Sequence, residues 1–212
     1  MVKTLHLRVH PTDPQTRLIK QATNVLHRGG VLICPTDASY SLVCRVGDKE
    51  AEDRIRSIRE VEQDHYFTIM CADVSTLATY AKISNTAYRL IRSLAPGPYT
   101  FILPATRELP RRLQDPKRKS IGLRVPVHPF VHGLLAEIDD PLLSSTLIDQ
   151  DLGMPYADPD LMLDKFGHAV NALIDCGPIG IEMSTVLDLT DSSPRLVRQG
   201  KGVVEDVLDL VS

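Results

Sequence analysis

The sequence predicts an α/β protein that has a mixed sheet in a single domain. Early in the chain, segments of helical periodicity alternate with short apolar runs, which is typical of strands joined by helices. Late in the chain, short apolar runs follow one another closely, and successive strands favour a partly antiparallel sheet. No repeat, low-complexity tract or linker interrupts the 212 residues, so we expect one domain over 1–212.

The first half is expected to begin with a strand and a helix. Residues 5–9 alternate apolar and polar side chains, as a strand does. Asp13 is placed to cap a helix with Pro14 at its first position, and Gly29 and Gly30 should end it. The same signals predict strands over 31–34, 41–46 and 66–71, and helices over 51–60, 73–80 and 85–94.

The second half is expected to be richer in strands. Pro129 is placed to open a helix over 128–138, and a short helix is expected over 203–210. Apolar runs predict strands over 99–105, 120–126, 142–148, 171–176, 184–189 and 194–200.

Composition is that of a soluble globular protein, with 43% apolar and 24% charged residues. No apolar run approaches the ~20 residues of a membrane span, and the N-terminus lacks the apolar block of a signal peptide. Cys34, Cys44, Cys71 and Cys176 lie in apolar contexts without a CxxC pair, which favours reduced cysteines in the core. We therefore expect a cytoplasmic protein without a membrane partner, and we assign no metal site.

Charge is divided unevenly along the chain. Residues 1–136 carry 20 Lys and Arg against 12 Asp and Glu, whereas residues 137–212 carry 4 against 15. A basic half in a chain of net charge −3 favours a positive surface that faces an anion, such as a nucleotide or a nucleic acid. Two solvated faces that merely differ in charge are the alternative.

The stretch CPTDASYSLVC places polar residues between two apolar runs, without the Asn-Gly, Asp-Gly or Gly-Gly pair of a tight hairpin. We interpret it as a polar ledge between two buried strands. Similar polar residues follow other predicted strands, where a ligand can reach them beside a dry sheet. The set is Thr36, Asp37, Arg124, Ser144, Ser145, Thr146, Ser184, Thr185 and Arg198.

Taken one at a time, these residues are most simply structural, since serine and threonine are ordinary in turns. As a set they are hydroxyls and fixed cations with neither a catalytic triad nor paired carboxylates, and this favours binding of an anionic ligand. The phosphate loops GxxxxGK[ST] and GxGxxG are absent, so side chains and strand-end amides would have to hold a nucleotide. Arg124 stands among apolar neighbours and needs an anionic partner, which a ligand carboxylate or phosphate would supply.

The densest basic stretch is PRRLQDPKRKSIGLR, residues 110–124. This concentration of positive charge is explained equally well by a loop that is exposed to solvent and by a loop that contacts nucleic acid. The residues expected to bind RNA under the second interpretation are Arg111, Arg112, Lys117, Arg118 and Lys119.

Six segments of the chain occur in a recognisable order: GGVLICPTDASYSL, APGPYTFIL, IGLRVPVHP, LLSST, STVLDL and RLVRQGKG. They resemble the YrdC-like family, whose best-known members are threonylcarbamoyl-AMP synthases, and the resemblance covers residues 10–202. PTDASYSL and IRSIREVEQDHYFTIMC are more similar to the YciO branch than to the synthase branch. The resemblance implies a YrdC-like fold with a twisted mixed sheet, flanking helices and a concave, positively charged groove.

The resemblance also implies roles for particular residues. Thr36 would position threonine, Arg124 would pair with its carboxylate, and Ser184 would line the join between the two ligands. The residues implied for the nucleotide are Arg59, Ser145 and Arg198. The family's Lys-x-Arg is Arg59-Glu60-Val61 here, and its Ser-x-Asn is Ser145-Thr146-Leu147. One cation has become the larger guanidinium of Arg59, a second has become valine, and an amide has become leucine, which puts nucleotide affinity and the substrate in question.

The implied activity is that of a nucleotidyltransferase in the pathway to the N6-threonylcarbamoyladenosine of tRNA. It would form an adenylate from L-threonine, bicarbonate and ATP with Mg²⁺ as substrates, without a prosthetic group and alongside partner proteins of the pathway. No catalytic residue is assigned, because an aspartate after Pro-Thr such as Asp37 more often stabilises a turn. Two alternatives stay open: a protein that binds double-stranded RNA or tRNA, and an enzyme that makes a different carbamoyl adenylate.

Overall fold

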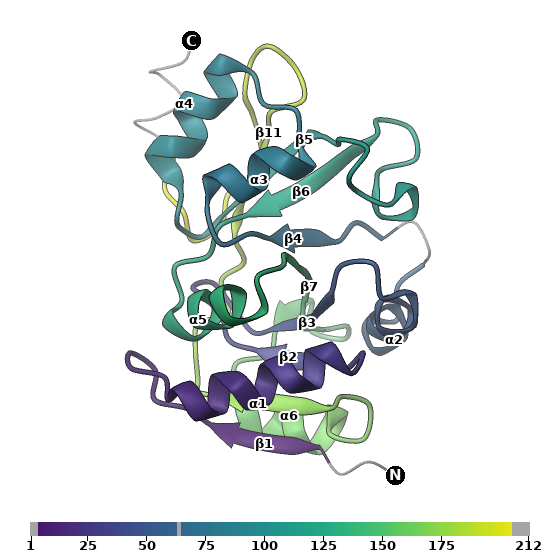
Figure 1. Cartoon of the computed structure of the whole chain (residues 1–212), viewed down its shortest axis with the longest axis vertical. Coiled ribbons are helices and arrows are strands. Elements are labelled where there is room, and N and C mark those ends of the chain that lie inside the picture. The colour runs from purple at the N-terminus through teal and green to yellow at the C-terminus, as the bar shows by residue number, and fades with distance from the viewer. Residues whose placement is uncertain (1–3, 63–64, 205–212) are drawn as a thin grey trace.

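A mixed sheet runs the length of the molecule in the computed structural model, which describes residues 4–62 and 65–204 (Figure 1). Within these residues ten strands join in the order β1-β10-β2-β3-β7-β4-β6-β5-β11-β12, with parallel and antiparallel neighbours. The strands are β1 (Leu5–Arg8), β2 (Leu32–Cys34), β3 (Ser41–Arg45), β4 (Thr68–Met70), β5 (Tyr99–Pro104), β6 (Ser120–Arg124), β7 (Leu142–Thr146), β10 (Ala172–Asp175), β11 (Thr185–Asp188) and β12 (Arg195–Arg198). A separate hairpin pairs β8 (Ile148–Asp149) with β9 (Met154–Pro155).

Helices flank this sheet, so the predicted α/β class and mixed sheet are confirmed. They are α1 (Thr16–His27), α2 (Lys49–Arg59), α3 (Val74–Tyr80), α4 (Asn85–Leu94), α5 (Pro129–Ile138) and α6 (Pro159–Phe166), with a 3-10 turn η1 (Arg111–Leu113). α1 and α5 pack against each other. In Figure 1 α3 lies over β6, and α4 lies at the end of the molecule that holds β5 and β11. None of the described helices is both long and apolar enough to cross a membrane.

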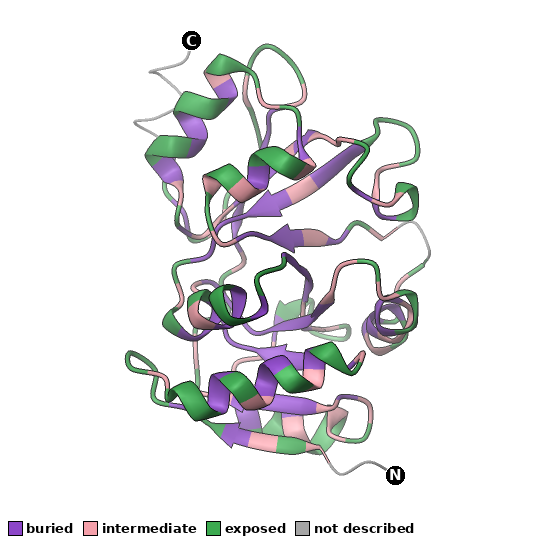
Figure 2. Cartoon of the chain, in the orientation of Figure 1, coloured by how far each residue is buried: buried purple, intermediate pink, exposed green. Residues whose placement is uncertain are grey.

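Apolar residues of the helices form two clusters against the sheet. One joins α1 and α5 to one face of β1, β2, β3, β4, β7 and β10, and the other joins α2, α3, α4 and α6 to residues of β2–β7, β10 and β11. The buried faces of the helices point toward the strands, and their exposed faces point outward (Figure 2). Cys34, Cys44 and Cys71 are buried in the core, as expected, whereas Cys176 is only half-buried.

Two sequence predictions for helices are corrected by the structure. α1 begins at Thr16 with Gln15 as its N-cap, so Asp13 and Pro14 lie before the helix. α6 was not predicted, although Asp158 accepts a hydrogen bond from Asp160 N at its start. Residues 205–210 of the predicted C-terminal helix lie outside the described residues.

The sequence of α2 explains why Arg59 is its last residue. Asp48 caps the helix, because its carboxylate accepts the backbone N–H of Ala51 at 3.1 Å. Glu60 takes the left-handed conformation, with φ 51°, and ends the helix. The arginine is thereby held at the boundary between α2 and the loop that leads to β4.

Candidate functional site

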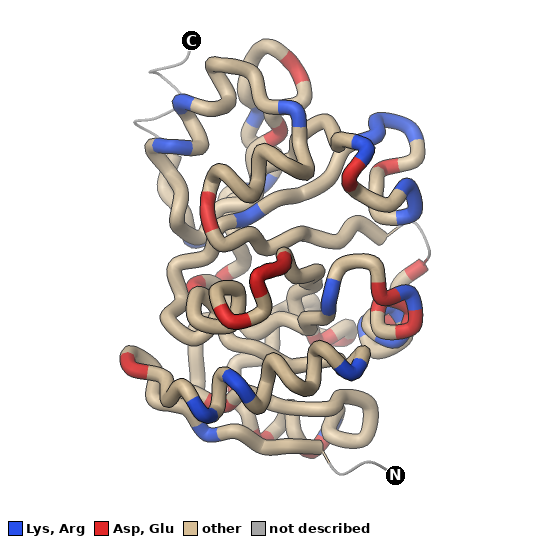
Figure 3. Tube along the Cα trace, viewed as in Figure 1, with Lys and Arg blue, Asp and Glu red and all other residues tan. Residues whose placement is uncertain are grey.

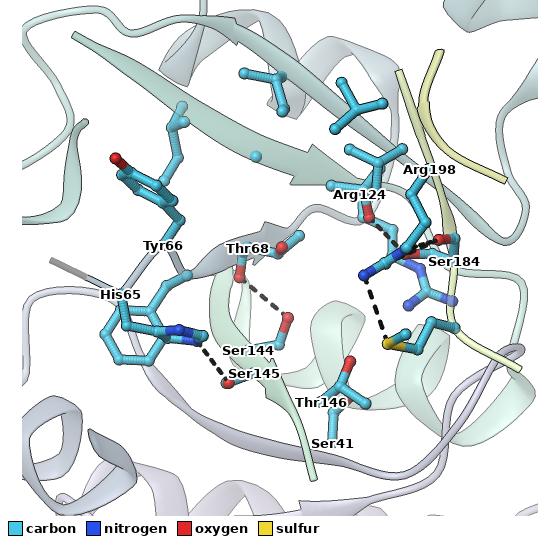
Figure 4. A pocket seen from close by; sticks show the side chains of 18 of the residues that line it. Ser41, His65, Tyr66, Thr68, Arg124, Ser144, Ser145, Thr146, Ser184 and Arg198 are labelled. Carbon is cyan, nitrogen blue, oxygen red and sulfur yellow. Dashed lines mark hydrogen bonds between the residues drawn. The ribbon is translucent and has the colours of Figure 1, made fainter. Parts of the chain in front are cut away.

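A pocket of about 600 Å³ opens over β4, β6 and β7, a volume typical of sites for small molecules. Its floor is polar because neighbouring strands present hydroxyl groups to it. Thr68 pairs in register with Ser144 on one side and Gly122 on the other, and the hydroxyls around it face one space (Figure 4). A Cβ at Gly122 would lie 3.2 Å from the side chains of Thr100 and Thr68, so glycine keeps this part of the floor open.

Arg124 lies at the end of β6 and forms an ion pair with Asp37 of the ledge. The side chains are only 7% and 8% exposed. The sequence analysis expected a ligand to supply the anionic partner of Arg124. In the structure, Asp37 of the same chain supplies it. Burial lowers the pKa of Arg124, and the charge of Asp37 opposes this shift. Arg124 Nε and Asp37 Oδ2 are buried and have no hydrogen-bond partner among the described residues, so each group uses only part of its bonding capacity.

Ser184 and Arg198 lie beside this ion pair. Arg198 donates from Nε and Nη2 to the carbonyl oxygen of Ser184, at 3.2 and 2.9 Å. The Ser184 hydroxyl is 2.9 Å from the hydroxyl of Thr100 on β5. Burial lowers the pKa of Arg198, and the nearby charge of Arg124 lowers it further. We refer to Asp37, Arg124, Ser184 and Arg198 as the Arg124 group.

A second group lies where α2 meets β7. Arg59 is 5% exposed and donates from Nε to Ser145 Oγ at 3.4 Å and from Nη1 to Ile148 O at 3.2 Å. His65 Nε2 lies 3.2 Å from the same Ser145 hydroxyl (Figure 4). We refer to Arg59, His65 and Ser145 as the Arg59 group.

The guanidinium of Arg59 is buried, and no ion pair within the described residues balances its charge. Its contacts are a hydroxyl and a carbonyl, and none of the described carboxylates pairs with it. Burial alone lowers the pKa of Arg59. A buried cation that lacks an anion is costly, so an anionic ligand at this position would gain a charged partner at once.

Five of the six residues that the resemblance implied for the ligands line this pocket. They are Arg59, Arg124, Ser145, Ser184 and Arg198. Thr36 is not among the lining residues. Its hydroxyl accepts the N–H groups of Ala38 and Ser39 and donates to Ser39 O at 2.7 Å, so it holds the turn of the ledge. The role of Thr36 toward a substrate stays a prediction.

The sequence analysis did not single out several residues that line the pocket. These are His65, Tyr66, Thr68 and Asp115. His65 and Tyr66 lie just before β4 in the run DHYFTIM. Their position at the start of a buried strand is the feature of the sequence that could have indicated them. Nothing in the sequence indicated Asp115, which reaches the pocket from the long loop between β5 and β6.

The basic loop between β5 and β6 is tied to its surroundings. Arg112 forms a two-pronged pair with Glu52 of α2, at 2.8 and 2.9 Å, and Arg118 pairs with Asp188 of β11 at 2.8 Å. Basic residues gather on this loop (Figure 3). In the described part of the chain no ion pair involves Arg111, Lys117 or Lys119. The RNA-binding role of the loop and the concave basic groove both stay predictions.

Of the three departures from the synthase pattern, Arg59 lines the pocket, whereas Val61 and Leu147 lie outside its lining. Val61 follows α2, is half-buried, and its N–H donates to Arg56 O at 3.1 Å. Leu147 is 1% exposed and belongs to the apolar core. Leucine at this position therefore packs inside the protein.

Comparisons with known proteins agree on one family. The model named for Sua5, YciO and YrdC proteins, and described as "Telomere recombination", matches residues 24–200. An uncharacterized protein of Haemophilus influenzae is 48% identical over 195 residues, which cover 92% of this chain and 94% of that protein. A threonylcarbamoyl-AMP synthase of Vibrio vulnificus is 30% identical over 186 residues, 86% of this chain and 98% of the relative.

A solved structure shows the same arrangement of elements. The crystal structure of Escherichia coli YciO superposes with a TM-score of 0.92 at 42% identity, over 95% of this chain and 98% of that one. The order of strands and helices described above is therefore shared with that protein along almost all of the chain.

Proposed function

The chain belongs to the Sua5/YciO/YrdC family, and from this premise we propose that it is a nucleotidyltransferase of the threonylcarbamoyl-AMP synthase type. Its substrates are ATP with Mg²⁺, bicarbonate and a small amino acid, with L-threonine as the first candidate. The relative of that name in Vibrio vulnificus supports the reaction class. Because the chain is 42% identical to YciO, the test below includes each amino acid in turn.

One observation carries the proposal: a buried arginine that pairs with none of the described carboxylates lines the same pocket as Arg124. Arg59 offers a fixed cation to an anionic ligand, and Ser145 offers a hydroxyl beside it. Arg124 offers a second guanidinium, which is already paired with Asp37. A ligand with a phosphate group and a zwitterionic end matches both groups, and that is the chemistry of an amino acid beside ATP.

The amino acid is assigned to the Arg124 group. The carboxylate of the ligand would accept from the guanidinium of Arg124, which lines the pocket. Ser184 lies next to this pair through Arg198 and adds a hydroxyl. The phosphates are assigned to the Arg59 group, where Arg59 and Ser145 would contact them.

The reaction needs placement more than covalent catalysis. The amine of the amino acid combines with bicarbonate to give a carbamate and water. A carbamate oxygen then attacks the α-phosphorus of ATP, a new P–O bond forms, and the bond to the β-phosphate oxygen breaks to release pyrophosphate. The arginines would neutralise phosphate charge and hold the reactants in line, which supplies most of the barrier reduction in such transfers.

The test is formation of the adenylate by the parent protein. It is incubated with ATP, Mg²⁺, ¹⁴C-bicarbonate and each amino acid, and the labelled adenylate and released pyrophosphate are measured. Arg59→Ala should reduce the rate by about 10-fold or more, since one charged hydrogen bond is worth ~1.5–3 kcal/mol. Arg89→Ala, an exposed arginine on α4, is the matched control and should leave the rate unchanged.

Absence of a labelled adenylate with every amino acid would overturn the proposed activity. Formation of one with an amino acid other than threonine would retain the reaction class and change the substrate. An RNA-binding function would instead be favoured if the folded protein makes no adenylate but binds duplex RNA with an affinity that falls steeply with salt.

A further inference from the structure

The loop between β5 and β6 forms a fixed wall of the pocket. Arg112 holds it to α2 through Glu52, whose side chain is 0% exposed, with two hydrogen bonds of 2.8 and 2.9 Å. Leu109 and Leu113 anchor its base in the apolar core. A long loop with these attachments holds a side chain in place far better than a free surface loop does.

Arg118 is the basic residue of this loop that lines the pocket. Its Nη1 donates to Asp188 Oδ2 at 2.8 Å and its Nη2 donates to Thr190 Oγ1 at 2.5 Å. A guanidinium carries five N–H donors, so three remain for a ligand. The pairing fixes the position of the side chain without using up its hydrogen-bonding capacity.

The charge of Arg118 is also only partly balanced. Asp188 Oδ2 accepts from Arg195 as well, at 2.8 Å, so one carboxylate is shared by two guanidinium groups. Burial raises the pKa of Asp188, but hydrogen bonds from Thr190, Arg118 and Arg195 outweigh this and hold it below its ordinary value. Asp188 is therefore ionised at neutral pH, and its single negative charge is shared between Arg118 and Arg195.

Asp115 is a carboxylate of the same loop that also lines the pocket. Its Oδ1 accepts the N–H groups of Lys117 and Arg118, at 2.8 and 2.6 Å, so this oxygen is turned into the loop. A polyphosphate would bring Mg²⁺ with it, which offsets the remaining negative charge. Asp115 is consequently compatible with an anion that contacts Arg118.

We propose that Arg118 is a phosphate-binding residue that contacts the pyrophosphate portion of the nucleotide, together with Arg59. The two side chains enter one pocket from different elements, the loop and α2. Synthases carry a second cation at the position of Val61, and this chain has valine there. Arg118 supplies the missing positive charge from another part of the chain. The assignment rests on the proposed function, which places a nucleoside triphosphate in this pocket.

Calorimetric titration with inorganic pyrophosphate and Mg²⁺ tests the assignment. Arg118→Ala should weaken binding about 10-fold or more, which corresponds to ~1.4 kcal/mol. Arg118→Lys should give an intermediate loss, because it keeps the charge and loses the planar guanidinium. Arg111→Ala is the matched control: it removes the same charge from an exposed position of the same loop outside the pocket lining, and binding should change less than twofold.

Asp188→Asn separates ligand contact from a role in holding the loop. It removes the ion pair and keeps Arg118, so pyrophosphate binding should stay within about threefold of the parent while thermal stability falls. Equal loss of binding in Asp188→Asn and Arg118→Ala would overturn the assignment, and so would parent-like binding in Arg118→Ala or no binding by the parent. A parent that binds pyrophosphate through Arg118 but makes no adenylate would overturn the proposed function alone.

Discussion

The Arg124 group and the Arg59 group each bury an arginine in the same pocket, but they balance its charge in different ways. Arg124 is paired with Asp37, a carboxylate of the chain itself. Arg59 contacts Ser145 and the carbonyl of Ile148, and the described residues give it no carboxylate. The charge of Arg124 is balanced by the protein itself, whereas the charge of Arg59 would be balanced by an anionic ligand.

This difference separates selectivity from affinity. A ligand at Arg124 meets a guanidinium that is already paired with Asp37, so charge alone gains it less there, and its fit to the surrounding side chains decides whether it binds. A ligand at Arg59 gains simply by being negative. We infer that the Arg124 group selects the small substrate and that the Arg59 group provides much of the binding energy for an anion.

The comparison is tested most strongly by replacing each arginine with methionine. Arg124→Met leaves Asp37 buried without a counter-charge, and we expect a loss of ~3–5 kcal/mol in the free energy of unfolding. Arg59→Met leaves no buried carboxylate behind, so its cost should be about 1 kcal/mol or less, or even a gain. Urea denaturation with unchanged m-values measures both.

The double change Asp37→Asn with Arg124→Met is the control for this experiment. It removes both charges, and it should recover at least half of the stability lost in Arg124→Met. Equal losses in Arg59→Met and Arg124→Met would break the comparison, since they would require a hidden counter-charge at Arg59.

The sequence located most of this site because strand-end polar residues are visible in an apolar pattern. Arg124 was found from its apolar neighbours in GLRVP, and Ser145 from the hydroxyl run after LL. The pairing of Arg124 with Asp37 was not predictable, because the two residues are 87 positions apart and meet only when β6 lies beside the ledge. Likewise, Arg118 lines the pocket because the long loop between β5 and β6 folds so that Arg118 pairs with Asp188 of β11, and this path of the loop was not predictable.

Leu147 shows the limit of reading positions from a family pattern. It follows Ser145 by two residues, and Ser145 lines the pocket, so strand alternation places its side chain on the same face. β7 ends at Thr146, however, and the side chain of Leu147 is buried in the core. An asparagine here would not reproduce the amide of the synthase pattern without a local rearrangement.

The next prediction concerns stability at this position. Leu147→Asn should destabilise the fold by ~2–4 kcal/mol, because it removes apolar contacts and buries an amide with few partners. Leu147→Met keeps the volume and should cost less than about 1.5 kcal/mol. Thermal and urea unfolding of both variants provide the measurement. A stable Leu147→Asn protein that binds ATP more tightly would show that this residue belongs to the phosphate side of the comparison.

The smallest effect is expected from restoring the cation that the synthase pattern carries after Arg59. Val61 is half-buried and lies outside the pocket lining, so a guanidinium at Val61→Arg would reach a phosphate only through solvent-exposed space. Exposed ion pairs contribute ~1 kcal/mol or less, which gives at most about a 5-fold gain in ATP affinity. Val61→Gln is the neutral control, and Val61→Glu should weaken binding by a similar factor.

Because this contribution is screened by salt, the differences among the three variants should shrink when the titration is repeated at high ionic strength. A gain of 100-fold or more in Val61→Arg that persists in salt would contradict this reasoning: it would mean that the Arg59 group retains the full phosphate geometry of the synthases, and that Arg118 is not needed to complete it.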